Sequence, residues 1–194
     1  RSATSKEVSQ AHICLGFPSP SFKDKQRYAC LVLNTILGGG MSSRLFQKVR
    51  EEKALAYSIY SYQDFYEDAG VLGIYLATSP EQAAPAVELV LNELSKIKKE
   101  KPPRSEFESA KEQLKGNLVL GLESTSSRMN RLGRNELFLG EYVSLKQALG
   151  AIDAVKPAHV AEQAIRLFSE ARLSAAFLGS MGREVLDKIN WAKI

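Results

Sequence analysis

The stretch that decides the fold covers residues 38–60 and reads GGGMSSRLFQKVREEKALAYSIY. Three glycines, Gly38 to Gly40, follow an apolar pattern of helical spacing and predict that a helix ends there. A serine at position 42 or 43 can cap a second helix that runs to Lys53, because the apolar residues after it again recur at helical spacing. From Ala54 onward the residues favour a strand. The stretch therefore predicts a helix end, a second helix and a strand in close succession.

Similar patterns extend outward from this stretch in both directions. In chain order they predict a strand over 8–17, helices over 23–37 and 42–53, strands over 54–66 and 70–78, helices over 79–99, 105–122, 125–140, 144–154 and 157–169, and a strand over 173–178. Residues 67–70 predict a hairpin turn. Ser79 before Pro80, and Ser105 before Glu108, predict capped helix starts.

This order of elements predicts an α+β fold. We expect a mostly antiparallel sheet that is covered on one face by helices, because strands and helices do not alternate regularly along the chain. No linker, repeat or low-complexity segment divides the sequence. We therefore expect a single domain over residues 1–194.

Composition and charge exclude several classes of protein. Of the 194 residues, 44% are hydrophobic and 25% are charged, which is typical of a globular chain. No apolar run approaches the roughly 20 residues of a membrane helix. The net charge is +4, and the lysines and arginines are interleaved with acidic residues rather than clustered. We expect no membrane and no nucleic-acid partner. Cys14 and Cys30 lie in apolar contexts, which predicts two buried thiols and slightly favours the cytoplasm.

The residues of this chain alone do not predict a catalytic centre. A catalytic zinc ion needs three protein ligands, and the two histidines, His12 and His159, stand at opposite ends of the sequence. His159 opens a run that resembles an inverted zinc motif, but Gln163 occupies the second ligand position and is a poor zinc ligand. No serine lies in a nucleophile-elbow motif, and Gly38 to Gly40 lack the Gly-Lys-Ser/Thr of a phosphate loop. We expect no metal site and a structural His12.

Residues 38–60 resemble the signature of the second half of zinc peptidases in the pitrilysin/insulinase family, above all bacterial enzymes similar to mitochondrial processing peptidase. The resemblance extends from about Val8 to about Gly179 and includes ESTSSRM at 123–129 and GRNEL at 133–137. It implies one of two similar α+β halves that face each other like a clamshell around a chamber. The first half of such enzymes carries an H-x-x-E-H helix and a distant Glu that hold zinc.

This chain matches the second half only, and it begins with Arg1 and has its first methionine at Met41. We therefore expect a piece of a longer protein, the C-terminal half of a two-half peptidase, with the zinc motif upstream. The zinc of the intact enzyme would be bound by the N-terminal half that is absent from this chain, and the piece alone would be inactive.

Two residues carry the family's R-x-x-x-x-x-x-Y pair, Arg50 and Tyr57. The resemblance implies that both are catalytic residues that reach toward the zinc site. Peptide hydrolysis at zinc leaves negative charge on the carbonyl oxygen. The Tyr57 hydroxyl can donate a hydrogen bond to that oxygen, and the Arg50 guanidinium can hold substrate carbonyls or carboxylates. From the residues alone, a solvated helix end and a packing tyrosine are the alternatives.

A glycine loop is a further candidate for substrate binding. In mitochondrial processing peptidase, the partner subunit has a longer glycine-rich loop at the matching place that contacts substrate. The resemblance therefore gives a candidate substrate-binding role to three residues, Gly38, Gly39 and Gly40. A hinge between two helices is the alternative for this triple glycine.

A basic stripe is the last candidate. Arg128, Arg131 and Arg134 fall three residues apart on a predicted helix. If the stripe faces the chamber, it would favour acidic or extended peptides, with Arg128 as a substrate-binding residue. A solvated helix face is the alternative reading of these three arginines.

The resemblance implies a substrate-binding, active-site-completing half of a zinc-dependent endopeptidase that hydrolyses peptides in an enclosed chamber. Its partners would be the N-terminal zinc-binding half of the same protein and peptide substrates, which would add a strand to the sheet edge of the zinc half. A homodimer is left open. The alternative is a non-catalytic partner or scaffold subunit, since the family includes halves that have lost the zinc motif. Retention of Arg50 and Tyr57 favours the enzyme.

Overall fold

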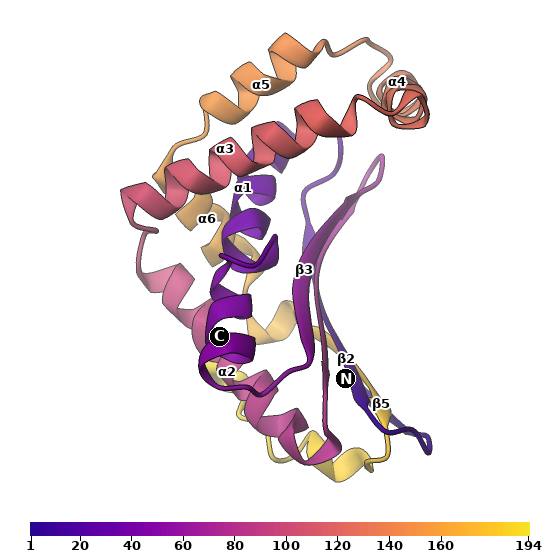
Figure 1. The fold of residues 1–194 in the computed structure, drawn as a ribbon, viewed down its shortest axis with the longest axis vertical. Coiled ribbons are helices and arrows are strands. Elements are labelled where there is room, and N and C mark those ends of the chain that lie inside the picture. Colours follow the sequence, from indigo (N-terminus) through magenta and orange to yellow (C-terminus); the bar gives the residue numbers. More distant parts are fainter.

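The computed structural model describes residues 1–194 as a five-stranded sheet with helices over one face (Figure 1). The strands are β1 (Ser2–Ser5), β2 (Ala11–Ser19), β3 (Ser58–Phe65), β4 (Gly70–Thr78) and β5 (Ser174–Gly179). They lie in the order β1-β5-β2-β4-β3, which leaves β1 and β3 as the edge strands. All neighbours are antiparallel except β1 and β5, which are parallel. The predicted α+β class and the mostly antiparallel sheet are confirmed.

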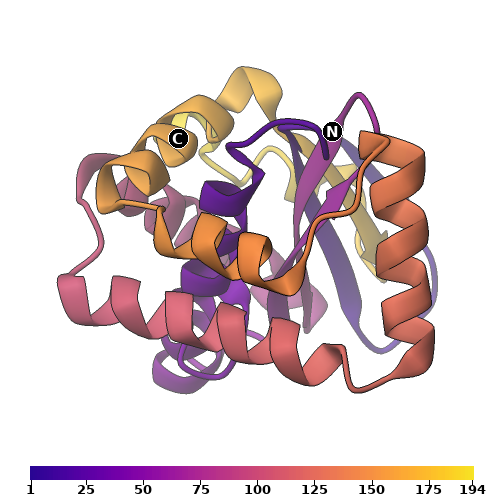
Figure 2. The same ribbon diagram turned by 90° about the horizontal axis from the view of Figure 1, so that it is seen from above.

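The helical layer contains six α-helices and one π-helix. They are α1 (Arg27–Gly38), the π-helix η1 (Phe46–Glu52), α2 (Ala83–Lys99), α3 (Arg104–Gly121), α4 (Thr125–Leu139), α5 (Leu145–Asp153) and α6 (Pro157–Leu167). Four short 3₁₀ turns, η2 to η5, lie at Pro80–Gln82, Glu170–Arg172, Arg183–Val185 and Trp191–Lys193. Each helix is too short or too polar to span a lipid bilayer. Seen from above, α1, α2 and α6 lie over the sheet, while α4 stands apart beside its end (Figure 2).

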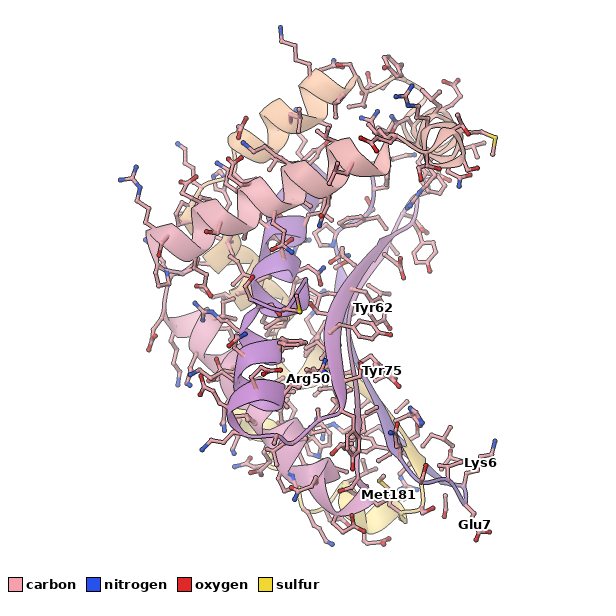
Figure 3. All side chains as sticks on the ribbon, viewed as in Figure 1. Lys6, Glu7, Arg50, Tyr62, Tyr75 and Met181 are labelled. Atoms are coloured by element: carbon pink, nitrogen blue, oxygen red, sulfur yellow. The ribbon has the colours of Figure 1, made fainter.

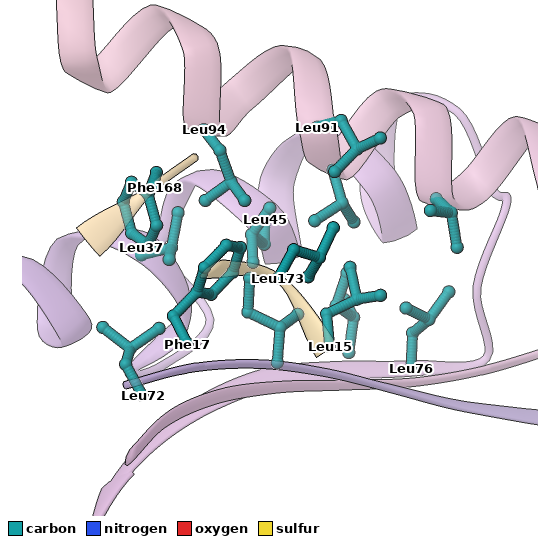
Figure 4. Close-up of a cluster of buried hydrophobic side chains, with 14 of the residues drawn as sticks. Leu15, Phe17, Leu37, Leu45, Leu72, Leu76, Leu91, Leu94, Phe168 and Leu173 are labelled. Atoms are coloured by element: carbon teal, nitrogen blue, oxygen red, sulfur yellow. The ribbon is translucent and has the colours of Figure 1, made fainter. Parts of the chain in front are cut away.

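Alternation along the central strands separates a buried face from an open one. Ile13, Leu15 and Phe17 of β2 are buried against the helices, whereas the residues between them point to the open face. Figure 4 shows Leu15 and Phe17 between the sheet and α2, and the Phe17 and Phe168 rings meet edge to face at 5.1 Å. The core is one cluster of 40 buried residues. The core packs against the helix-covered face of the sheet only, so the opposite face of the sheet is not covered by this chain.

The helix α4 adds little to this core. Asn135 is its one buried residue. Its ends are well formed all the same, because the Ser124 hydroxyl accepts a hydrogen bond from the Ser127 amide at 3.3 Å and Gly140 ends the helix in the left-handed conformation with φ of 68°. Local sequence thus specifies α4 as a helix, although only one of its side chains is buried.

One strand was missed by the sequence patterns. β1 has the polar sequence SATS, and its side chains are exposed apart from a half-buried Ala3. It forms because its backbone pairs in parallel with β5, where Ser2 lies opposite Ala176. An edge strand fixed by main-chain pairing with a segment about 170 residues away leaves no local hydrophobic pattern.

Three predicted helix caps do not form. Near η1, the Ser43 hydroxyl donates to the Gly40 carbonyl and no serine side chain caps the helix. Ser79 makes no side-chain cap, because Pro80–Gln82 forms a 3₁₀ turn and α2 begins only at Ala83. Ser105 makes none either, since α3 begins one residue earlier, directly after Pro103. A complete capping box does form at α5, where Ser144 and Gln147 bond reciprocally.

Candidate functional site

A sharp chain reversal joins η1 to β3 and places the two residues of the R-x-x-x-x-x-x-Y pair. Ala54 lies at the bend with φ of 51°, the left-handed conformation that L-residues seldom adopt. The Ala54 amide donates to the Arg50 carbonyl at 3.1 Å, and the Leu55 amide donates to the Val49 carbonyl at 2.9 Å. The bend is therefore fixed by backbone hydrogen bonds to the helix that precedes it.

The exit from the bend is fixed just as firmly. The Tyr57 amide donates to the Ala77 carbonyl at 2.8 Å, which joins it to β4 one residue before β3 begins. The Thr78 hydroxyl, itself buried, donates to the Leu55 carbonyl at 2.6 Å. Arg50 and Tyr57 thus stand on the two arms of a rigid turn at the beginning of the edge strand β3.

Arg50 is exposed near the end of η1, and its guanidinium is largely unengaged. Its Cζ atom lies 4.8 Å from the Phe46 ring centroid, and its nearest carboxylate is that of Glu51 at 3.9 Å. Stacking on the half-buried Phe46 directs the guanidinium without using its N–H donors. Figure 3 shows Arg50 beside β3, on the helical side of the sheet. Its planar fork of donors is available to a ligand.

Tyr57 is 60% exposed, and its phenol makes no hydrogen bond to the protein. A tyrosine that serves only packing would bury its ring, and a buried phenol would be paired. Tyr57 does neither. No hydrogen bond or ion pair joins it to Arg50, so each group can address a ligand separately from its own arm of the turn.

The open face of the sheet carries an aromatic cluster that the sequence reasoning missed. Tyr60 and Tyr62 of β3 project from this face together with Tyr75 of β4. The Tyr60 ring lies 5.1 Å from the Tyr75 ring and 6.3 Å from the Tyr62 ring. His12 of β2 extends the cluster, since its Nδ1 lies 2.7 Å from the Tyr75 hydroxyl. The signal in the sequence was the alternation of tyrosines in β3, read together with the register of β4.

Burial shifts the titration of two phenols on this face. Desolvation, with a smaller effect of nearby Cys14, raises the pKa of the Tyr62 phenol, and desolvation together with Tyr60 raises that of Tyr75. Figure 3 shows Tyr62 and Tyr75 extending from the side of the sheet opposite to the helices. The face offers aromatic surface with hydroxyl groups, which suits contact with peptides.

The prediction of two buried thiols holds for Cys30 and is wrong for Cys14. Cys30 lies inside α1, and its Sγ contacts the Gln163 side-chain oxygen at 3.4 Å. Cys14 occupies a position of β2 that points to the open face and is exposed. The apolar neighbours of Cys14 in sequence point to the other face, so sequence context alone was misleading at an alternating strand.

The triple glycine forms a packed junction between α1, β3 and α3. Gly38 is buried, and a Cβ atom there would lie 2.4 Å from the Ser61 amide nitrogen, so only glycine permits this close approach. The Gly39 carbonyl accepts a hydrogen bond from the Gln113 side chain at 3.0 Å, and Gly40 lies against that same side chain. These contacts hold the loop in place at the end of α1.

The basic stripe on α4 divides into two parts. Arg128 is exposed, and its Nε donates to the Leu122 carbonyl just before the helix. Arg131 and Arg134 instead line a cavity on the helical side of the sheet. The three-residue spacing predicted a common face, but only its second and third members turn inward.

The histidines and acidic residues of the chain do not meet in a metal centre. His12 contacts Tyr75 on the sheet, while His159 is exposed on α6 and accepts a hydrogen bond from the Lys156 amide at 3.2 Å. No group of three or more His, Cys, Asp or Glu side chains is arranged to hold a metal ion. Gln163, at the second position of the inverted motif, is buried and bonded to Gln26 at 2.8 Å. A zinc site does not fit these residues.

Comparisons with known proteins identify the family of this chain. A family model described as "Peptidase M16 inactive domain" matches residues 3–114. The "uncharacterized zinc protease YmxG" of Bacillus subtilis is 46% identical over 165 residues, which cover 85% of this chain and 40% of that protein. A zinc protease of Mycobacterium tuberculosis is 43% identical over 178 residues, 92% of this chain and 40% of that protein. The chain thus spans about 40% of the length of these relatives.

Solved structures share the fold at lower identity. A protease from Helicobacter pylori aligns with a TM-score of 0.82 and 24% identity over 91% of this chain and 43% of its own. A chain in the structure of Complex III2 from Candida albicans aligns with a TM-score of 0.84 and 18% identity over 97% of this chain and 49% of its own. The family model matches more than half of this chain, and the Bacillus subtilis relative aligns over 85% of this chain. This chain therefore belongs to the peptidase M16 family, that of pitrilysin and insulinase, and corresponds to its inactive domain.

Proposed function

We propose that this chain is the substrate-binding half that completes the active site of a zinc-dependent endopeptidase. The zinc would be held by an N-terminal half of the same protein, and peptides would be hydrolysed in a chamber between the two halves. Two observations support this assignment of roles to the two halves. Relatives of this chain are named zinc proteases, and this chain spans only about 40% of their length.

The observation that carries the proposal is the exposed pair at the beginning of β3. Tyr57 presents an unbonded hydroxyl, and Arg50 presents a guanidinium whose nearest carboxylate is 3.9 Å away. When bound in the other half, zinc supplies a polarised water. The Tyr57 hydroxyl would donate a hydrogen bond to the substrate carbonyl oxygen as negative charge develops on it. Arg50 would hold a neighbouring substrate carbonyl or carboxylate with its forked donors.

The open sheet face would form the wall of the chamber on this side. Tyr60, Tyr62 and Tyr75 give it an aromatic surface, and their rings lie within 6.3 Å of a neighbour. Such a surface contacts extended peptides through ring stacking and hydroxyl hydrogen bonds with little demand on sequence. The glycine loop Gly38 to Gly40 and Arg128 stay candidate substrate contacts in this arrangement.

Removing the Tyr57 hydroxyl tests the catalytic role most sharply. In the intact two-half protein, Tyr57→Phe is expected to lower kcat by roughly 10- to 1000-fold, the scale of one lost oxyanion donor. Tyr142→Phe is the matched control, because Tyr142 is 63% exposed and lies between α4 and α5. Hydrolysis of a quenched fluorescent peptide measures both variants. Equal kcat values for Tyr57→Phe and the wild type would contradict the assignment.

Arg50 is expected to act mainly through substrate handling. Arg50→Ala should raise KM for the same peptide by about tenfold or more, since one charge-assisted contact is lost. The control is Arg104→Ala, because Arg104 is exposed at the start of α3 and makes no ion pair. An unchanged KM for Arg50→Ala would remove this role.

A second candidate function is a non-catalytic partner or scaffold subunit. This chain is similar in fold to a chain of the Candida albicans Complex III2 structure, which favours this second function. At 18% identity, the similarity shows a shared fold and not a shared role. The sequence upstream of this chain discriminates the two functions. An H-x-x-E-H motif there supports the peptidase, and its absence supports the scaffold.

A further inference from the structure

A cavity of about 470 Å³ lies on the helical side of the domain, between α1, α3, α4, α5 and the end of β3. Its volume is within the range of small-molecule sites. Nine of its 16 lining residues are hydrophobic, among them Leu31, Leu114, Leu118 and Ile152. The aromatic cluster and the pair Arg50 and Tyr57 do not line it. The cavity is therefore separate from the candidate active site.

Three arginines line this cavity without a counter-charge. Arg27, Arg131 and Arg134 are among the 16 lining residues, and no Asp or Glu is. None of the three makes an ion pair with a carboxylate within 4.0 Å. Guanidinium groups stay charged at all ordinary pH values. Three such charges along low-dielectric walls create a positive potential that favours an anion.

The positions of these guanidiniums are built into the fold. Two of them lie near the Phe22 ring, whose centroid is 4.9 Å from the Arg27 Cζ and 5.2 Å from the Arg134 Cζ. Arg27 donates to the Phe22 carbonyl and, at 3.1 Å, to the Tyr28 hydroxyl. Arg134 also donates to the Phe65 carbonyl at 2.7 Å, and Arg131 makes a single long contact of 3.4 Å with the Ser144 carbonyl. Each guanidinium carries five N–H donors, so most of their donors are unused.

Two amide side chains in the cavity wall each have one buried polar atom without a hydrogen-bond partner. Asn135 is only 5% exposed, and its Nδ2 donor makes no hydrogen bond. The Gln63 side-chain nitrogen bonds to Ser19 at 2.6 Å, whereas its Oε1 acceptor is unpaired. An unsatisfied buried polar group costs about 1–3 kcal/mol and is uncommon in folded proteins. In this cavity, a bound ligand with oxygen acceptors would satisfy the Asn135 donor.

We propose that this cavity binds a small organic anion, a carboxylate joined to a single apolar group. The carboxylate would lie among the three arginines and Asn135, and the apolar group would lie against Leu114 and Leu118. The C-terminal residue of a peptide has this chemistry, and so does a short fatty acid. The site does not rest on the proposed peptidase function, because it uses neither Arg50 nor Tyr57.

Calorimetric titration of the 194-residue chain tests the site with three probes. They are N-acetylphenylalanine, its uncharged amide, and octanoate. We expect the acid to bind at least tenfold more tightly than the amide, because only the acid carries the carboxylate. Binding of N-acetylphenylalanine but not octanoate assigns the site to peptide C-termini, and the reverse assigns it to fatty acids. Equal binding of acid and amide, or no binding of either anion at millimolar concentration, would overturn the proposal.

Two arginine variants of α4 locate the binding. Arg131→Gln should weaken binding of the acid at least tenfold, whereas Arg128→Gln should leave it unchanged, since Arg128 does not line the cavity. Circular dichroism of both variants checks the fold, and the loss of a single 3.4 Å contact at Arg131 is compatible with folding. Equal weakening by the two substitutions would show a diffuse effect of charge and contradict a built site.

Discussion

The Tyr62 ring lies directly over Gly73, its partner across the β3–β4 pair. A Cβ atom at Gly73 would lie 2.2 Å from the Tyr62 Cζ, so a larger residue must displace the ring. Glycine at this position is thus what allows the aromatic cluster to lie flat on the open face, in the way that aromatic rings cover strand glycines elsewhere.

Gly73→Ala is expected to move the Tyr62 ring into solvent. The pKa of the Tyr62 phenol should then fall toward its ordinary value, because desolvation is the main cause of its rise. Gly16→Ala is the control, since Gly16 pairs with Gly73 on the adjacent strand and has nothing within 4 Å of its Cβ position. Phenol titration by NMR measures the shift. An unchanged Tyr62 titration in Gly73→Ala would contradict this packing.

The two cysteines should differ in reactivity and in their effect on stability. Burial, with Asp24 as a lesser cause, raises the Cys30 pKa from 9.0 to about 12. The folded state then holds the thiol proton that the unfolded state releases near pH 9. The contribution of Cys30 to the free energy of unfolding is therefore complete below about pH 9 and is lost as pH rises toward about 12.

Urea unfolding at pH 8 and pH 11 measures this linkage. The wild type should lose more stability between the two pH values than Cys30→Ala does, and equal losses would contradict it.

Thiol labelling at pH 8 should modify Cys14, which is exposed, and leave the buried Cys30 intact. Cys14→Ser should abolish the labelling.

At the scale of elements, the turn between η1 and β3 is the feature that positions the candidate catalytic pair. Its bend depends on Ala54 at φ of 51°. Ala54→Val should destabilise the protein by roughly 1–2 kcal/mol, since a β-branched residue fits this conformation poorly. Ala54→Gly should change the free energy of unfolding by less than about 0.5 kcal/mol, because relief of strain opposes a more flexible unfolded chain. Urea midpoints compare the two, and equal effects would argue against a strained bend.

Most elements could be predicted from local patterns, and the failures share a cause. The helices α2 to α6 and the β3–β4 hairpin follow from apolar spacing, Pro and Gly positions, which act within a few residues. β1 was missed because its pairing with β5 is a long-range main-chain contact. The caps at Ser79 and Ser105 were wrong because a nearby proline set where each helix began, Pro80 directly after Ser79 and Pro103 two residues before Ser105.

The site was predictable only in part, for a related reason. Arg50 and Tyr57 were named from a motif, and their exposure is consistent with the expected role. The aromatic cluster needs the register that sets Tyr60 opposite Tyr75, and the arginine-lined cavity needs α4 placed against α3 and α5. Strand register and helix placement are properties of the tertiary fold, which residue spacing does not encode locally.

At the scale of the whole molecule, the domain has one face closed by helices and one face left open. The 40-residue core lies on the closed side, and the tyrosines with the exposed Cys14 lie on the open side. Arg50 and Tyr57 stand at the edge strand of this sheet. An incomplete site of this kind, with no metal cluster of its own, is explained if a second half of the protein supplies the metal.

The most direct measurement of that claim is hydrolysis of a quenched peptide by the 194-residue chain, by the proposed N-terminal zinc-binding half, and by the two together with zinc. We expect turnover only from the combination, and loss of most of that turnover when the added chain carries Tyr57→Phe. Full activity of the zinc half alone, or an unchanged rate with the Tyr57→Phe chain, would contradict it.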